Sequence, residues 1–473
     1  MIRYDDTNDT SILQYAKKLE GKSFSEVVKE SNKYLNEDGD SVLHEDKAEY
    51  YSDTKSKGSL GHLIEEYYFG YDINSNQEAD FSKTGLELKV IPLKEVRNKI
   101  SVKERVVITI INYDTIIDEP FENSHVVGKL SSILMVFYLH DGSGEKLNYR
   151  IKNVYHYTVP YEDYLIIKRD YDLIAEKVRA GKAHELSEGD TLFLGACTKG
   201  ANKSALRTQP NNDVLAMQRA FSLKISYMNY VYSNYVTRKS APPEKIIKDS
   251  TQLLEKSFEE IVLEMLVDYY GKSKSELLDM LGLSYEKEPK NILTIIIYRI
   301  LGVKTNLAEE FAKANIDVKT IRLNDKNKIN EHMSFPTFKF TEIVNQDWTE
   351  SDLHNIFNEK KFLFVVFEIG SDNEYRLKKA LFWNMPMDTL NGPVQDTWQA
   401  AKTVVENGLV LKNHGSRTTN NFPSASYNRI CHVRPHAQNK DDVYPMPDGT
   451  FYTKQSFWLD KSYILKIING CDK

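Results

Sequence analysis

Apolar residues recur along the chain with two different periods, which together predict a mixture of helices and strands. Residues 61–69 carry apolar side chains at helical spacing, whereas 86–91, 105–112 and 132–138 are apolar, β-prone runs of the kind that form strands. Further helices are expected over 163–180 and 387–407. The pattern therefore predicts a mixed α/β architecture.

The second half of the chain repeats the pattern of the first. Four pairs of segments match in the same order: 80–93 with 310–323, 133–142 with 362–371, 148–160 with 374–386, and 221–228 with 451–458. Because chance matches would not keep one order, we expect a tandem duplication, in which one chain forms a pseudo-dimer.

A polar stretch separates the two repeats. Residues 236–251 contain the adjacent prolines Pro242 and Pro243, and this composition is typical of a linker. We therefore predict one α/β domain over 1–235 and another over 252–473. The length of 473 residues also favours two domains over one core.

Charged residues cluster around the first predicted strand. Glu87 and Lys89 stand two positions apart, so they project from the same face of a strand. The polar segment 82–85 predicts a turn that returns Asp80 to the start of this strand. Glu65, on the preceding helix, would contact the same place. Carboxylates with a neighbouring lysine suit phosphodiester hydrolysis with Mg²⁺, so we predict metal ligands and, in Lys89, a group that orients water or offsets charge.

The spacing of these residues is common by chance, but their surroundings form a longer motif. The string KGSLGHLIE occupies 57–65, ADF occupies 79–81, and GLELK occupies 85–89. This resembles the N-terminal signature of the MutH-type endonucleases of the PD-(D/E)xK class. Ala79 replaces the proline of the class pattern, which the MutH branch tolerates. The motif selects Glu65, although the helical phase does not exclude Glu66.

The resemblance extends along nearly the whole chain. Further segments are similar to the two-domain, GATC-cutting restriction enzymes of the staphylococcal type: 185–189, 197–202, 218–224, 430–436 and 453–458. The resemblance implies a restriction-endonuclease-like, MutH-like fold in each half. It also implies a type II restriction endonuclease that cuts double-stranded DNA at GATC with Mg²⁺ and leaves 5′-phosphates.

Two other functions are compatible with the motif. One is a strand-nicking repair endonuclease of the MutH kind, which the fused second half disfavours because a pseudo-dimer reaches both strands of a palindrome unaided. The other is a non-catalytic regulator that binds GATC, which the retained Glu65 disfavours.

The second half carries altered counterparts of the predicted catalytic residues. Its helix offers no carboxylate, because Ile297 aligns with Glu65. Its carboxylates have exchanged lengths: Glu310, Asp317 and Lys319 align with Asp80, Glu87 and Lys89. Because Mg²⁺ demands near-ideal octahedral geometry, we predict that the second half does not cleave. The resemblance implies instead an effector domain that binds a second copy of GATC and helps cleavage by the first half.

The resemblance also indicates DNA contacts. In the second half it assigns this role to Arg434, Tyr452 and Lys454, and an arginine can contact O6 and N7 of guanine together. In the first half the candidates are Lys57, Lys199, Arg207 and Lys224. There, Lys224 aligns with Lys454, whereas aligning Cys197 with Cys431 places Gly200 opposite Arg434. Lys199 and Arg207 remain alternative substitutes.

The composition excludes some classes of function but does not identify one. The net charge of −6 gives no support to DNA binding, so basic charge must be local. The histidines His62, His156, His184 and His432 form no HExxH pattern, which argues against a zinc enzyme, and no GxxxxGK[ST] motif indicates ATP use. Three cysteines without paired spacing and a polar, acidic N-terminus predict a soluble cytoplasmic protein without a membrane segment. We expect a monomer, and DNA-induced dimerisation or looping of two sites stays open.

Overall fold

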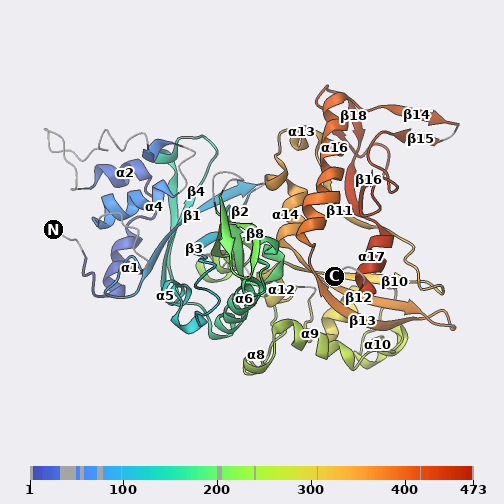
Figure 1. Cartoon of the computed structure of the whole chain (residues 1–473), viewed down its shortest axis with the longest axis horizontal. Coiled ribbons are helices and arrows are strands. Elements are labelled where there is room, and N and C mark those ends of the chain that lie inside the picture. Colours follow the sequence, from blue (N-terminus) through green and yellow to red (C-terminus); the bar gives the residue numbers. More distant parts are fainter. Residues whose placement is uncertain are drawn as a thin grey trace. The chain divides into compact units, whose positions relative to one another are not determined.

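The computed structural model describes residues 4–31, 50–53, 58–71, 78–96, 98–199, 205–238, 241–305, 307–415 and 417–470 (Figure 1). The chain divides into two compact units. The first comprises Met1–His184 and Thr191–Pro242, and the second comprises Glu185–Asp190 and Pro243–Lys473. The boundary between the two units after Pro242 lies inside the predicted linker. The sequence did not indicate that Glu185–Asp190 belongs to the second unit.

The first unit contains a mixed four-stranded sheet in the order β2-β1-β4-β5. Its two central strands are parallel and its outer strands are antiparallel to their neighbours: β1 (Glu87–Val96), β4 (Ile133–Leu139), β2 (Lys99–Val102) and β5 (Arg150–Tyr157). One face of the sheet packs against three helices that lie together on that side (Figure 1): α1 (Asp9–Lys17), α2 (Phe24–Lys29) and α4 (Ser59–Leu63). The apolar runs of β1 and β4 form strands because they can be covered in this way.

A second sheet of the first unit is antiparallel throughout. Its order is β3-β9-β6, with bounds Val106–Ile110, Arg219–Leu223 and Leu194–Thr198. The long helix expected over 163–180 is α6 (Tyr161–Arg179), and α7 (Ile225–Val231) follows β9. The predicted strands and this helix are confirmed to within a few residues at each end.

The second unit repeats three of the four strands of the mixed sheet and all three strands of the antiparallel sheet, and its described residues hold no counterpart of β2. Its mixed sheet has the order β10-β12-β13, with bounds Ile316–Leu323, Lys361–Ile369 and Tyr375–Trp383. Strand β10 is parallel to β12, as β1 is to β4, and β13 is antiparallel to β12, as β5 is to β4. Its antiparallel sheet is β11-β19-β16, with bounds Met333–Phe338, Gln455–Leu459 and Cys431–Pro435. This agreement confirms the predicted tandem duplication.

The helix expected over 387–407 is interrupted. It consists of α15 (Met387–Thr389), a π-helical turn η8 (Leu390–Val394) and α16 (Gln395–Asn407). Gly392 has non-helical angles (φ −112°, ψ −106°), and Pro393 inside the turn lacks the N–H that a continuous helix needs. Among the described residues, no helix is long and apolar enough to cross a membrane.

The strand ladders fix how the two units correspond residue by residue. In each antiparallel sheet, the last residue of the central strand pairs with one residue of each neighbour. Leu223 lies between Val106 and Leu194, just as Leu459 lies between Met333 and Cys431.

This correspondence corrects two of the sequence alignments. The match of 221–228 with 451–458 was wrong, because Lys454 lies between β18 (Phe451–Thr453) and β19 rather than after the central strand. The pairing of Cys197 with Cys431 was also wrong. By ladder position, Lys224 corresponds to Asp460 rather than Lys454, and Arg434 corresponds to Cys197 rather than Gly200.

Candidate active site

The predicted turn before β1 brings Asp80 to the first strand residues. Phe81 and Leu86 form an antiparallel bridge, in which the Phe81 N–H donates to the Leu86 carbonyl at 2.9 Å. Gly85 closes the turn with a φ of 72°, a conformation that other residues adopt with strain. The Asp80 Oδ2 accepts a hydrogen bond from the Leu88 N–H at 2.7 Å. The carboxylate of Asp80 is therefore fixed beside the start of β1.

Glu87 lies buried between two lysines. Its exposed fraction is 1%, and its Oε1 accepts from the Nζ of Lys89 at 2.6 Å. The Nζ of Lys129 lies 3.0 Å from Oε1 and 3.2 Å from Oε2. A buried carboxylate is costly unless it is paired, so the two ammonium groups compensate for the burial of Glu87.

The sequence interpretation missed Lys129. This residue lies on α5 (His125–Leu130), 42 positions after Glu87, in a short helix with no motif of its own. Its only signal is its position shortly before the apolar run of β4, which pairs with β1. Only the pairing of these strands brings it to the site.

The helix that carries Glu65 changes its winding at this residue. The expected helix over 61–69 is α4 followed by a π-helical turn, η1 (Ile64–Phe69), and such turns frequently occur at functional sites. Glu66 is buried and accepts from the Tyr51 hydroxyl at 2.5 Å. Glu65 is half-buried and lies close enough to Asp80 for their charges to interact. The geometry therefore agrees with the motif in selecting Glu65 over Glu66.

The carboxyl groups of the site repel one another. Burial is the main reason that the pKa of Glu65 is raised to about 7, with the charges of Asp80 and Glu87 adding to it and those of Lys89 and Lys129 opposing it. The pKa of Asp80 is also raised, first by burial and then by Glu87. A site that holds several carboxylates together against this repulsion favours a bound cation.

Tyr71 also faces this cluster and was not singled out from the sequence. Burial, followed by the charges of Asp80 and Glu65, raises the pKa of its hydroxyl. The hydroxyl is buried and has no hydrogen-bond partner within the part of the chain that the structure describes. It is therefore a hydrogen-bond donor available to a ligand at the site.

Comparisons with known proteins agree with this geometry. The type II restriction enzyme Sau3AI of Staphylococcus aureus is 37% identical over 471 residues, covering 90% of this chain and 95% of that protein. The chain belongs to the family of MutH-like type II restriction endonucleases. The sequence model described as DNA mismatch repair enzyme MutH matches residues 69–170, which include three of the four predicted catalytic positions.

MutH proteins match only part of this endonuclease. That of Vibrio campbellii is 24% identical over 239 residues, which is 49% of this chain but 97% of that protein. That of Pasteurella multocida is 27% identical over 152 residues, 32% of this chain and 67% of that protein. The duplicated architecture is therefore shared with the restriction enzyme along its length, whereas a MutH protein matches about one half.

Two predicted DNA contacts of the first unit lie close together. Lys199, after β6, and Arg207, on β7 (Leu206–Gln209), are both exposed. The Lys199 N–H donates to the Gln218 carbonyl at 2.7 Å, and the Arg207 guanidinium donates to the Gln218 Oε1 at 2.9 Å. Lys57, the other candidate near the motif, lies outside the described residues.

Lys224 does not lie where a DNA contact is expected, which corrects that assignment. Its exposed fraction is 3%, and its Nζ donates to the Thr191 carbonyl at 2.5 Å. Its charge also opposes the effect of burial on the pKa of Asp170. Lys224 directly follows β9 at the N-cap position of α7, and its buried side chain binds the Thr191 carbonyl instead of capping the helix.

The predicted DNA contacts of the second unit all have intramolecular partners. Arg434 is exposed, with its guanidinium 5.5 Å from the centroid of the Trp458 ring. Lys454 forms an ion pair with Asp442 and lies over the Tyr444 ring. A third side chain, Tyr452, accepts from the Asn420 amide at 3.0 Å. These contacts hold the side chains in place near the surface.

The altered counterparts in the second unit do not assemble an acidic site. Both carboxylate oxygens of Glu310 accept backbone N–H groups, from Ile246 and Ile247, at 2.9 Å each. Asp317 pairs with Lys360 at 2.8 Å. Burial lowers the pKa of Lys319. Glu310 therefore anchors two backbone N–H groups, whereas its counterpart Asp80 lies in the acidic cluster of the first unit.

This anchor also corrects the predicted linker. Ile246 and Ile247 lie within 236–251, yet both are buried in the second unit. The C-terminal part of the predicted linker is therefore folded chain rather than a free connection.

Proposed function

We propose that this endonuclease cleaves double-stranded DNA at GATC with Mg²⁺, leaving 5′-phosphates, and that its catalytic residues are Glu65, Asp80, Glu87 and Lys89. The observation that carries this proposal is the convergence of three carboxylates and two lysines at the start of β1. GATC is the site cut by the staphylococcal type of enzyme that the sequence resembles, and the 37% identity to Sau3AI supports the same specificity.

The residues fit a magnesium ion. Glu65, Asp80 and Glu87 offer only oxygen ligands, which Mg²⁺ prefers. The raised pKa values of Glu65 and Asp80 show carboxyl groups that are crowded without a cation. We infer that these three residues hold the ion. When bound, it polarises the scissile phosphate and lowers the pKa of the attacking water.

Lys89 and Lys129 supply positive charge beside the carboxylates. Lys89 and Lys129 approach the buried Glu87 from β1 and from α5. Their ammonium groups lie where charge on the phosphate grows during the displacement, so they stabilise the transition state or orient the attacking water. Lys129 is therefore added to the catalytic residues predicted from the motif.

We infer that the second unit binds a second GATC site and does not cleave. Glu310 binds two backbone N–H groups, Asp317 pairs with Lys360, and Ile297 is apolar. Among the described residues, these counterparts of the acidic cluster therefore provide no group of carboxylates for Mg²⁺. Its DNA contacts in this proposal are Arg434, Tyr452 and Lys454, with Lys57, Lys199 and Arg207 in the first unit. Because one chain carries both units, we propose a monomer in the absence of DNA.

The test is cleavage of an unmethylated plasmid, with Mg²⁺ or EDTA, followed by sequencing of the ends. We compare Glu87→Gln with Asp317→Asn, a matched change at the corresponding strand position of the second unit. Mg²⁺-dependent double-strand cuts at GATC are expected from the wild type and from Asp317→Asn but not from Glu87→Gln. Circular dichroism of each variant establishes that it is folded.

Other outcomes separate the rival functions. Nicks in one strand would support a repair-type enzyme. Tight binding to GATC duplexes without any cleavage would overturn the nuclease assignment and support a DNA-binding regulator. Loss of cleavage in Asp317→Asn with retention in Glu87→Gln would assign catalysis to the other unit.

A further inference from the structure

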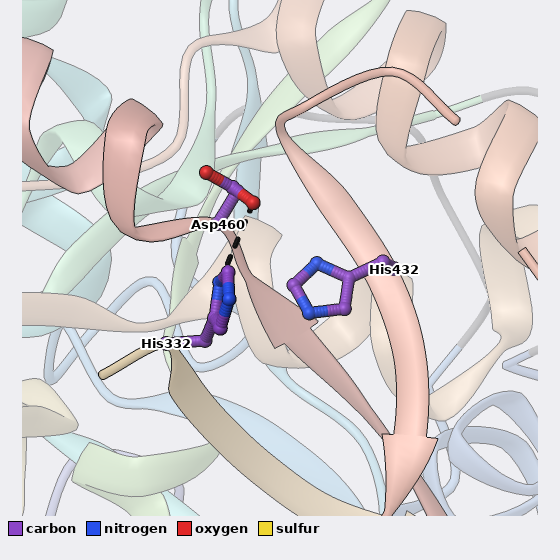
Figure 2. Close-up of side chains that lie close together, drawn as sticks. All are labelled: His332, His432 and Asp460. Atoms are coloured by element: carbon purple, nitrogen blue, oxygen red, sulfur yellow. Dashed lines mark ion pairs between the residues drawn. The ribbon is translucent and has the colours of Figure 1, made fainter. Parts of the chain in front are cut away.

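Two histidines and an aspartate converge in the antiparallel sheet of the second unit (Figure 2). His332 directly precedes β11, His432 lies on β16, and Asp460 follows β19 as the N-cap of α17 (Lys461–Ile468). One ligand atom from each of the three residues lies within 4.8 Å of the others. The cluster therefore joins three elements that are far apart in the sequence.

His432 is the least expected member of this cluster. Its exposed fraction is 0%, and neither of its ring nitrogens has a hydrogen-bond partner among the residues described. A neutral imidazole has one donor and one acceptor nitrogen, and leaving both unpaired in the interior costs free energy. The His332 ring is close, with centroids 4.6 Å apart, but it stands edge-on and supplies no hydrogen bond.

Asp460 is held so that one oxygen faces the histidines. Its Oδ1 accepts from the N–H of Ser462 at 2.8 Å and from the Ser462 hydroxyl at 2.6 Å. Its Oδ2 lies 3.4 Å from the Nδ1 of His332, the contact drawn as a dashed line in Figure 2. Hydrogen bonds of this kind orient the carboxylate ligands of metal ions.

Charged residues of both signs surround the cluster. Burial, followed by the neighbouring His332, lowers the pKa of His432 to about 4, and burial also lowers the pKa of His332. The positive charges of Arg434 and Lys461 oppose a cation, but both side chains are exposed and screened by water, whereas Asp460 is buried.

The cluster has no equivalent in the first unit. The ladder positions of His432 and Asp460 correspond to Gly195 and Lys224 there, which offer no such ligands. It lies in the antiparallel sheet, whereas the acidic site and its altered counterparts lie at the first strands of the mixed sheets, so it is not a remnant of the acidic site.

We propose that His332, His432 and Asp460 bind a divalent transition-metal ion of the zinc type, which joins β11, β16 and α17. Two imidazoles and one carboxylate are ligands that Zn²⁺ or Co²⁺ accepts, whereas Mg²⁺ prefers oxygen alone. Tetrahedral zinc ligands of this kind lie about 3.3 Å apart, so binding draws the side chains together by roughly 1–2 Å. The ion fixes β16, the strand that presents Arg434.

The test is Co²⁺ binding to the EDTA-treated full-length protein in excess Mg²⁺, which occupies oxygen-only sites. Visible d–d absorption reports nitrogen coordination, competition with Zn²⁺ gives its affinity, and mass spectrometry gives the metal content per chain. The variants are His332→Ala and His432→Gln. The matched control is His436→Gln, which removes an exposed histidine just beyond β16.

One Co²⁺ or Zn²⁺ per chain is expected in the wild type and in His436→Gln. The affinity for the metal ion should fall by more than about a hundredfold in His332→Ala and His432→Gln. Removing a residue that only orients a metal ligand already costs about 10–100-fold, and removing the ligand itself should cost more. If His432→Gln does not fold, the half-buried His332 decides, and Zn²⁺ should raise the thermal midpoint of the wild type but not of His332→Ala. Binding that is unaffected by His332→Ala, or no binding by the wild type, would overturn the proposal.

Discussion

Single residues of the acidic site show what a sequence motif can identify. The spacing of Asp80, Glu87 and Lys89 predicts a common face, and the hydrogen bond from Leu88 to Asp80 shows how the turn completes it. The motif also selected Glu65, which a regular helix would not separate from Glu66. The π-helical turn makes the distinction, because it buries one glutamate against Tyr51 and leaves the other at the site.

Glu65 should make the stability of the metal-free protein depend on pH. Its folded pKa of about 7 lies above the ordinary value of 4.5, so its neutral form stabilises the fold below about pH 4.5 and this contribution is lost as the pH rises through 7. In EDTA, the wild type should therefore lose thermal stability between about pH 5 and pH 8 relative to Glu65→Gln, which stays neutral.

Scanning fluorimetry across this pH range gives the comparison directly. Mg²⁺ at pH 8 should raise the midpoint of the wild type, because a ligand that binds only the folded state stabilises it. Parallel pH curves for the two proteins in EDTA would show that the Glu65 carboxyl is not crowded in solution.

At the scale of elements, the sequence predicted β1, β4 and the turn before β1 because their signals are local. It could not predict Lys129, because this lysine reaches Glu87 only through the parallel pairing of β1 with β4. Gly392 and Pro393 interrupt a helix that the apolar spacing alone extends without a break.

The helix α5 should therefore be as necessary for cleavage as the motif on β1. Lys129→Ala should lower the single-turnover cleavage rate by about 10²–10³-fold, the range found when one preorganised electrostatic donor is removed. Lys129→Arg should retain more activity, since it keeps the positive charge. Lys168→Ala, which removes an ion-paired lysine of α6, is the control. A rate for Lys129→Ala within about threefold of the wild type would contradict the role.

Glu310 shows how the duplicated element acquired another use. Glu310→Ala leaves two backbone N–H groups, those of buried Ile246 and Ile247, without their acceptor. We expect the free energy of unfolding of the second unit to fall by about 1–3 kcal/mol for each unpaired group, measured by urea denaturation. Asp317→Ala, which removes a more exposed ion pair, should change it by less than about 1 kcal/mol. If the two substitutions lower the free energy of unfolding equally, Glu310 does not anchor the backbone of Ile246 and Ile247 as proposed.

At the scale of the whole molecule, the order of matched segments predicted the duplication, and the sheets confirm it. Short sequence matches gave the wrong residue correspondence in the antiparallel sheet, because similar strings fall on different elements. Lys224 directly follows β9 and is buried, whereas Lys454 lies between two strands. The approach of His332 and His432 was equally hidden, because they are distant in the chain and share no motif spacing.

The two units should make cleavage depend on the number of sites. If the second unit binds GATC as an effector, a plasmid with two sites should be cut faster than one with a single site, and a GATC oligonucleotide added in trans should accelerate the single-site reaction.

Arg434→Ala should weaken that activation, since loss of a bidentate guanine contact costs about 1–3 kcal/mol, or roughly 5–150-fold in oligonucleotide affinity. Lys454→Ala should instead weaken binding to all DNA sequences alike and reduce its dependence on salt, as expected for a phosphate contact. If one-site and two-site plasmids are cut equally fast and the oligonucleotide has no effect, the second unit contributes to the stability of the protein and does not bind GATC as an effector.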